Sequence, residues 1–313
     1  MVRPGSLARV ILAIIFVASG VIYAQQLPPS QLQVFISAID GSGAPISDLK
    51  PEDIAMTENG APGKVVSLER YNLPIKLTLA VDNSSESQVA LAAVRTGLTA
   101  MVEALPQDME VTLITMAPQP NMFVKPTTDR AQITRGISRF GVDTEASRFS
   151  ETLVEYAERL DKDFKDKKLT YFPMLVFVST SQPENVGIQR DTIEKGMKMF
   201  VARGARMSVA MVSTKPTDAE SVANLKQGRQ ALTATPLVNA TKGKFETMVA
   251  FSRMATLLPE WGKEIGASHT KQTNQFRTII ERPNGNTGQL NNPGLRITRP
   301  GANAVISFDG KFD

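Results

Sequence analysis

A carboxylate and a hydroxyl stand two residues apart in this chain, at Asp82 and Ser84, directly after an apolar segment. The preceding residues 77–81 are mostly apolar, which predicts a strand buried on both faces. In an extended loop, side chains two positions apart point to the same side. Oxygen atoms gathered in this way suit a hard cation such as Mg²⁺, although this short spacing does not by itself specify a metal site.

The segments around this loop alternate between strand and helix patterns. Continuous apolar runs predict core strands at residues 75–81, 111–116, 174–178 and 207–212. Apolar residues at helical spacing predict helices at residues 89–105, 133–140, 150–162, 193–202, 222–232 and 254–265. This alternation predicts an α/β fold over residues 74–268, Rossmann-like and doubly wound, with a mostly parallel sheet. Ligands of such sheets bind beyond the carboxyl ends of the strands, where Asp82 and Ser84 are expected to lie.

Local signals predict several helix ends. Thr127 or Thr128 is expected to cap the helix that contains Ile133. Gly204 is expected to stop the helix before it, since glycine tolerates the left-handed conformation that ends many helices. Pro259 should start or kink the last helix.

Both ends of the chain have strand patterns. Residues 30–72 predict a small antiparallel β module, with Asn59-Gly60 as a hairpin turn. Residues 270–313 predict a C-terminal β tail. A module of this size rarely stands alone, so it should pack on its neighbours, and the sequence leaves open whether the tail pairs with it.

The first 24 residues have the pattern of a secretory signal. Arg3 and Arg9 provide the positive start, an apolar core follows, and Ala24 offers a cleavage point before Gln25. We therefore expect an exported protein, periplasmic or extracellular, with no membrane span in the mature chain. An uncleaved anchor is the alternative. The oligomeric state is not indicated.

Composition excludes several functional classes. The chain has no cysteine, so disulfides, thiol catalysis, thiolate metal sites and lipoprotein attachment are all excluded. The formal charge is +4, and without Arg3 and Arg9 it falls to about +2, which is too small to indicate nucleic-acid binding.

Motifs along nearly the whole mature chain resemble one family. The chain is similar to bacterial secreted proteins with a von Willebrand factor A-type domain, in the VWFA-related group. The resemblance rests on the N-terminal pattern of residues 34–40, 43, 45–46, 49, 52–54 and 58–60, the strand-end loop 77–84, and the later segments 240–245, 276–282 and 295–301. This resemblance implies a von Willebrand A fold and a binding function.

The family's metal-ion-dependent adhesion site consists of Asp-x-Ser-x-Ser, a threonine from a second loop and an aspartate from a third. Asp82 and Ser84 match this pattern, whereas Glu86 stands at the second serine position. The threonine position falls near Ser147, with Thr144 as a rival. Thr180 stands at the position of the third-loop aspartate, so that carboxylate is lost.

Two interpretations follow. In the first, the adhesion site is degenerate, because Mg²⁺ demands near-octahedral oxygen geometry and too few ligands are kept. In the second, Glu86 supplies the missing carboxylate, and Mg²⁺ or Mn²⁺ binds at a rebuilt site. The second interpretation predicts that Asp82→Ala abolishes metal binding.

The preferred function is an exported, non-catalytic protein that binds another protein or a cell-surface polymer, with no cofactor established. A metal-dependent adhesin using Glu86 is the first alternative, and a metal-assisted hydrolase is the second. Against an enzyme, the chain has a single histidine, His269, and no Gly-x-Ser-x-Gly elbow. His269 is expected near a helix end in a capping or surface role, and Trp261 in the core.

Overall fold

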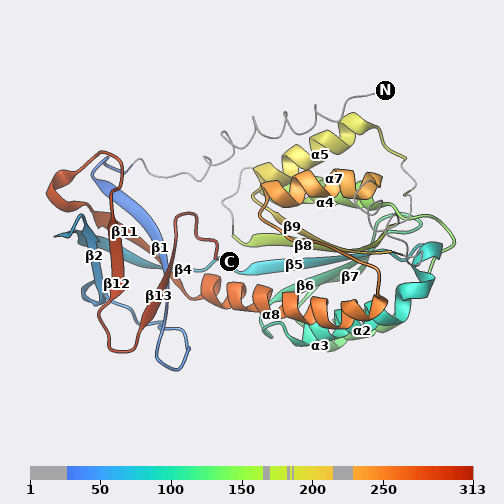
Figure 1. The fold of residues 1–313 in the computed structure, drawn as a ribbon, viewed down its shortest axis with the longest axis horizontal. Coiled ribbons are helices and arrows are strands. Elements are labelled where there is room, and N and C mark those ends of the chain that lie inside the picture. Colours follow the sequence, from blue (N-terminus) through green and yellow to red (C-terminus); the bar gives the residue numbers. More distant parts are fainter. Residues whose placement is uncertain (1–26, 165–169, 182–183, 185–186, 214–227, 313) are drawn as a thin grey trace. The chain divides into compact units, whose positions relative to one another are not determined.

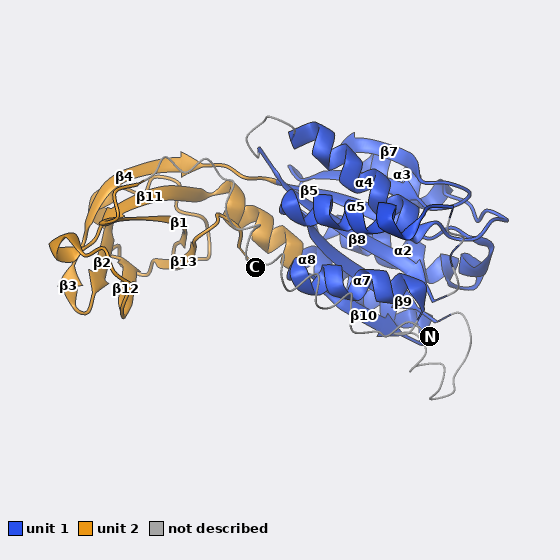
Figure 2. Ribbon diagram, turned by 90° about the horizontal axis from the view of Figure 1, so that it is seen from above, with its two compact units in different colours: residues 1–21, 75–263 blue, residues 22–74, 264–313 orange. Residues whose placement is uncertain are grey.

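The computed structural model describes residues 27–164, 170–181, 184, 187–213 and 228–312. The expected export signal of residues 1–24 lies outside this range. The described chain forms two compact units, one of residues 75–263 and one of residues 27–74 and 264–312 (Figure 2). The second unit is therefore built from both ends of the described chain.

The first unit contains a six-stranded sheet in the order β10-β9-β8-β5-β6-β7. Its strands are β5 (Ile75–Val81), β6 (Glu110–Thr115), β7 (Asn121–Thr127), β8 (Phe172–Thr180), β9 (Arg206–Val212) and β10 (Phe245–Met248). All neighbouring pairs are parallel except β6 and β7, which are antiparallel. β5 lies between β8 and β6, and both β5 and β8 are almost fully buried, as continuous apolar runs require.

Helices cover both faces of this sheet (Figure 1). One face carries α4 (Phe149–Phe164), α5 (Arg190–Ala202) and α7 (Arg229–Ala240). The other carries α2 (Leu91–Glu103), α3 (Arg130–Arg139) and the first part of α8 (Met254–Thr273), with the 3-10 helices η2 (Ser85–Ala90) and η3 (Phe251–Arg253) preceding α2 and α8. This mixed α/β architecture with a mostly parallel sheet confirms the predicted fold class. Among the described residues, no helix combines the length and apolarity needed to span a membrane.

Two glycines let α2 and α8 approach closely. A Cβ atom at Gly97 of α2 would lie 2.6 Å from the backbone oxygen of Met254, and one at Gly262 of α8 would lie 2.6 Å from the backbone oxygen of Met101. Both distances are too short for real atoms. The contact between these helices therefore depends on the absence of a side chain at both positions.

The second unit contains two antiparallel sheets. The larger has the order β13-β1-β11-β4 and the smaller the order β12-β2-β3. Their strands are β1 (Gln31–Ile39), β2 (Ile54–Glu58), β3 (Ala61–Pro62), β4 (Lys64–Tyr71), β11 (Gln275–Glu281), β12 (Pro293–Ile297) and β13 (Asn303–Ser307), with short helices η1 (Pro51–Asp53) and η4 (Pro283–Gly285). β11 runs between β1 and β4, and β12 pairs with β2, so strands from the two ends of the chain alternate. A shared apolar core joins the two sheets and includes Val34, Ile36, Met56, Phe276 and Ile280.

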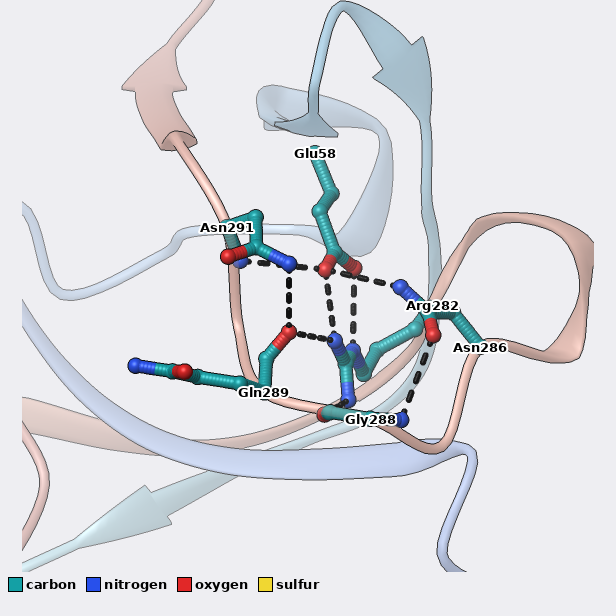
Figure 3. Close-up of polar contacts among 6 residues, drawn as sticks. All are labelled: Glu58, Arg282, Asn286, Gly288, Gln289 and Asn291. Atoms are coloured by element: carbon teal, nitrogen blue, oxygen red, sulfur yellow. Dashed lines mark hydrogen bonds and ion pairs between the residues drawn. The ribbon is translucent and has the colours of Figure 1, made fainter.

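A buried ion pair fixes one end of this unit (Figure 3). The Glu58 carboxylate at the end of β2 accepts two hydrogen bonds from the Arg282 guanidinium, at 2.9 and 2.5 Å, and another from the Asn286 amide at 3.0 Å. Arg282 also donates to the backbone oxygens of Gly288 and Gln289. The Arg282 guanidinium holds the pKa of Glu58 below its ordinary value. The pair ties the loop after β11 to β2.

Several local predictions were wrong. The helix cap at α3 is Asp129, whose carboxylate accepts the Gln132 N–H at 3.0 Å, and not Thr127 or Thr128. Pro259 does not start the last helix, because α8 begins at Met254 and contains Pro259; the predicted kink stays a prediction. His269 is not on the surface: it is 1% exposed within α8. The expected helix at residues 222–232 lies partly outside the described residues, which resume at residue 228. Within them, α7 begins at Arg229 and continues to Ala240.

Candidate functional site

Asp82 lies at the carboxyl end of β5 and is 3% exposed. Its Oδ1 accepts the backbone N–H of Ser84 at 3.0 Å. Its Oδ2 accepts the backbone N–H of Thr180 at 3.1 Å and the Thr180 hydroxyl at 2.6 Å. β5 and β8 are parallel neighbours, which brings these two strand ends together. Both oxygens of the carboxylate are thus bound by donors of the protein itself.

Ser84 is buried beside Asp82 but its hydroxyl is not used in the same way. Ser84 is 1% exposed, and its Oγ has no hydrogen-bond partner among the described residues. Its backbone oxygen accepts the hydroxyl of Ser87 at 2.7 Å and the N–H of Ser87 at 2.9 Å, which fixes the first turn of η2. The Ser84 hydroxyl therefore retains unused hydrogen-bonding capacity, which is costly in a buried group.

Asn83 joins the three loops of the site, a role that sequence reasoning missed. Its Oδ1 accepts the N–H groups of Met116 and Ala117 at 3.0 and 2.8 Å. Its Nδ2 donates to the backbone oxygens of Ala117 at 3.1 Å and Gly141 at 3.3 Å. Its own backbone oxygen accepts the N–H of Asp143 at 2.7 Å. The amide offers both donors and acceptors, so one side chain can satisfy backbone groups of two loops. A polar residue between two candidate ligands was the only available signal.

The remaining predicted residues divide into buried and exposed. Ser147 is 2% exposed, and its hydroxyl donates to the Met116 sulfur at 3.7 Å. Its rival Thr144 is exposed. Glu86 is exposed on η2. The structure thus brings Asp82, Ser84 and Thr180 together where the neighbouring strands β5 and β8 end. Ser147 contacts Met116 in the loop after β6. Glu86 is exposed to solvent.

A second carboxylate that the sequence did not single out lies at the start of α4. Glu184 accepts the backbone N–H and the hydroxyl of Ser150, each at 2.7 Å. Burial raises the pKa of Glu184, and the two hydrogen bonds from Ser150 only partly offset this. Nearby, Glu151 accepts both Arg148 at 3.0 Å and the N–H of Gly187 at 2.8 Å. These contacts attach the loop after β8 to α4.

The donor set determines which chemistry this site supports. Oδ2 of Asp82 accepts two hydrogen bonds from Thr180 and Oδ1 accepts one from Ser84, and Thr180 offers no charge to a cation. Within the described part of the chain, no group of three or more His, Asp or Glu side chains is placed to hold a metal ion. The Thr180 hydroxyl donates a hydrogen bond to the buried Asp82 carboxylate, which fixes the orientation of both side chains.

The α/β unit thus has a buried polar centre at the carboxyl end of its central strand, with loops around it. Residues 77–171 match the family model for the von Willebrand factor type A domain, a segment that runs from β5 to the start of β8. This match confirms the resemblance for residues 77–171, which are similar to a von Willebrand factor type A domain.

No curated protein matches the sequence. Among solved structures, a von Willebrand factor type A protein from Catenulispora acidiphila is 8% identical, with a TM-score of 0.49, over 78% of this chain and 52% of that one. This chain thus spans about half of that protein. The hypothetical protein BatB from Bacteroides thetaiotaomicron is 13% identical, with a TM-score of 0.43, over 60% of this chain and 98% of that one.

Proposed function

We propose that this protein is an exported, non-catalytic binding protein whose von Willebrand A domain recognises its partner without a metal ion. The recognition face consists of the loops after β5 and β6, the segment before α4 and the loop after β8. Loops at the carboxyl ends of parallel strands are where such sheets bind ligands. The partner is a protein or a cell-surface polymer.

The observation that carries this proposal is that both oxygens of the buried Asp82 carboxylate accept hydrogen bonds from the protein itself. Its three donors come from Ser84 and Thr180. Thr180 stands where the family has an aspartate, and its hydroxyl donates to Asp82 instead of supplying a second charge. Mg²⁺ sheds its water reluctantly and requires near-octahedral oxygen ligands. A single carboxylate already bound by the protein is a poor substitute for the family's ligand set.

One observation favours the metal-dependent alternative. The buried Ser84 hydroxyl has no partner among the described residues, and a cation would supply one. Glu86 would then have to turn from solvent toward Asp82 to add charge. A direct metal titration separates this alternative from the proposal.

The export part of the proposal rests on residues 1–24, with their basic start and apolar core. It places the protein in the periplasm or outside the cell. Fractionation of cells that produce the full chain tests this placement, and finding the protein in the cytoplasm would contradict it.

A binding experiment tests the recognition face. The full chain is immobilised, envelope proteins are passed over it in EDTA or in Mg²⁺, and the proteins that stay bound are identified. Glu86→Arg reverses a charge on the recognition face. Glu103→Arg makes the same change at the last residue of α2, toward the opposite end of the sheet. We expect a specific protein to be retained equally in both buffers, to be lost with Glu86→Arg and to be kept with Glu103→Arg. Retention that requires Mg²⁺, or that Glu103→Arg abolishes equally, would contradict the proposal.

The hydrolase alternative has its own test. The full chain is assayed on esters, peptides and phosphoesters together with Asp82→Ala. We expect no turnover, and turnover that disappears in the variant would overturn the non-catalytic assignment.

A further inference from the structure

The outermost strand of the larger β sheet exposes apolar side chains. β13 lies at the edge of this sheet and pairs only with β1 among the described strands. Val305 is 42% exposed, Ile306 39% and the following Phe308 64%. An edge strand with unpaired backbone groups and exposed apolar side chains is a template for pairing with another strand.

The opposite edge of the same sheet is protected, and β13 is not. The β4 edge carries Lys64, Glu69 and Arg70, and charged residues on an edge discourage further pairing. β13 reads Asn-Ala-Val-Ile-Ser and has no charge and no proline. This difference between two edges of one sheet indicates that β13 is normally covered.

The hydrogen bonds around β1 show which backbone groups of β13 point to the open edge. Ile39 and Pro45 form an antiparallel bridge. On either side of it, the backbone N–H of Asp40 donates to the backbone oxygen of Ala44, and that of Ile46 donates to the backbone oxygen of Ala38, both at 2.9 Å. In this antiparallel pattern, the N–H and C=O of Ile39 point away from Pro45 and therefore toward β13.

The register of β13 then assigns its free groups. Asn303 pairs with Ile39, and Val305 with Ser37. By alternation, the backbone groups of Asn303 and Val305 face β1, whereas those of Ala304 and Ile306 face the open edge.

We propose that β13 pairs with β13 of a second copy of this chain, antiparallel about a two-fold axis at Val305. In this arrangement Ala304 and Ile306 exchange backbone hydrogen bonds with Ile306 and Ala304 of the other copy. Val305 then faces its own counterpart and Phe308 faces Ala302 of the other copy. An isologous contact brings each residue near itself or its neighbours, so a charged strand would repel its own copy. The uncharged sequence of β13 satisfies this requirement, and the result is one sheet that continues through two chains.

The first test is the mass of the full chain in solution, measured by sedimentation over a concentration series. The pairing predicts twice the mass of the single chain. Ile306→Pro removes the isoleucine side chain and a backbone donor that points to the open edge, but no donor to β1, a change that edge strands tolerate. This variant should be monomeric with an unchanged circular dichroism spectrum. Val66→Lys changes an exposed position of β4 and should remain dimeric.

A charge exchange tests the two-fold axis itself. Val305→Lys and Val305→Glu each bring like charges together at the axis, so each variant alone should be monomeric. An equal mixture should recover dimers that contain one chain of each kind. A wild-type protein that stays monomeric at every concentration would overturn the proposal, as would a mixture that stays monomeric. A dimer that Val305→Lys leaves unaffected would equally overturn it.

Discussion

At the scale of single residues, Thr180 stands where the resemblance places the third-loop aspartate, so we propose that this position lacks a metal-binding carboxylate. Its hydroxyl lies 2.6 Å from Asp82 Oδ2, and both residues are almost fully buried. A buried carboxylate needs its donors, since burial of an unsatisfied polar group is costly. The hydrogen bond from Thr180 thus stabilises the buried negative charge of Asp82, which a bound cation would otherwise do.

Replacing Thr180 by valine tests this role. The variant keeps the size of the side chain but removes the hydroxyl, which should lower the free energy of unfolding by about 1–3 kcal/mol. Thr180→Ser keeps the hydroxyl and is the matched control. Urea denaturation followed by circular dichroism measures both. If valine and serine had the same effect, the hydrogen bond would contribute nothing.

Glu184 makes stability depend on pH. Because its folded pKa is raised, folded Glu184 keeps a proton that the unfolded chain, with an ordinary glutamate pKa of about 4.3, releases at lower pH. The stabilisation from this proton is complete below the unfolded pKa and is lost as the pH rises through the folded pKa. The wild type should therefore lose stability relative to Glu184→Gln from about pH 4 toward neutral pH. Urea denaturation at several pH values measures this difference, and parallel profiles for the two proteins would contradict it.

At the scale of elements, the contact between α2 and α8 depends on glycine. Gly97→Ala would place a Cβ atom 2.6 Å from the Met254 oxygen, so the helices must separate. We expect a loss of about 1–3 kcal/mol in the free energy of unfolding, which is usual for overpacking. Gly141→Ala is the control, since a Cβ atom there meets nothing within 4 Å. Thermal unfolding compares the variants, and an equal effect of both would show that the helix contact is not tight.

The elements also show what the sequence could predict. The buried strands β5 and β8 were predictable because continuous apolar runs have no other stable place in an α/β fold. β7 was missed because it is an antiparallel edge strand that carries Lys125 and Pro126 and has little apolar pattern. The role of Asn83 was missed because it depends on backbone groups of Met116 and Ala117, which lie far away in sequence.

At the scale of the whole molecule, both ends of the described chain build one unit, and a buried ion pair connects them. Glu58 and Arg282 are separated by 224 residues. The sequence predicted β structure at both ends but could not predict their pairing, because the register between distant strands depends on tertiary packing. The place of Thr180 in the metal pattern stays a prediction from the resemblance, whereas its hydrogen bond to Asp82 could not be predicted because it depends on the register of β5 and β8.

Glu58→Gln tests the connection between the ends. The substitution leaves the buried Arg282 guanidinium without a counter-charge, and leaving one charge of a buried pair uncompensated is strongly destabilising. We expect a lower midpoint of thermal unfolding and faster proteolysis of residues 283–292. Glu69→Gln removes an exposed ion pair with Arg277 on the larger sheet of the same unit and is the control. Equal effects of both variants would contradict the special role of Glu58.

We propose that the α/β unit functions without a metal ion because the Thr180 hydroxyl is hydrogen-bonded to the Asp82 carboxylate. Calorimetric titration of Mg²⁺ and Mn²⁺ into the full chain tests it most directly, with Asp82→Ala and Thr180→Asp measured alongside. The account predicts no saturable binding to the wild type or to Asp82→Ala, and a gain of binding in Thr180→Asp, which restores the second carboxylate. Saturable binding to the wild type that disappears in Asp82→Ala would contradict the account.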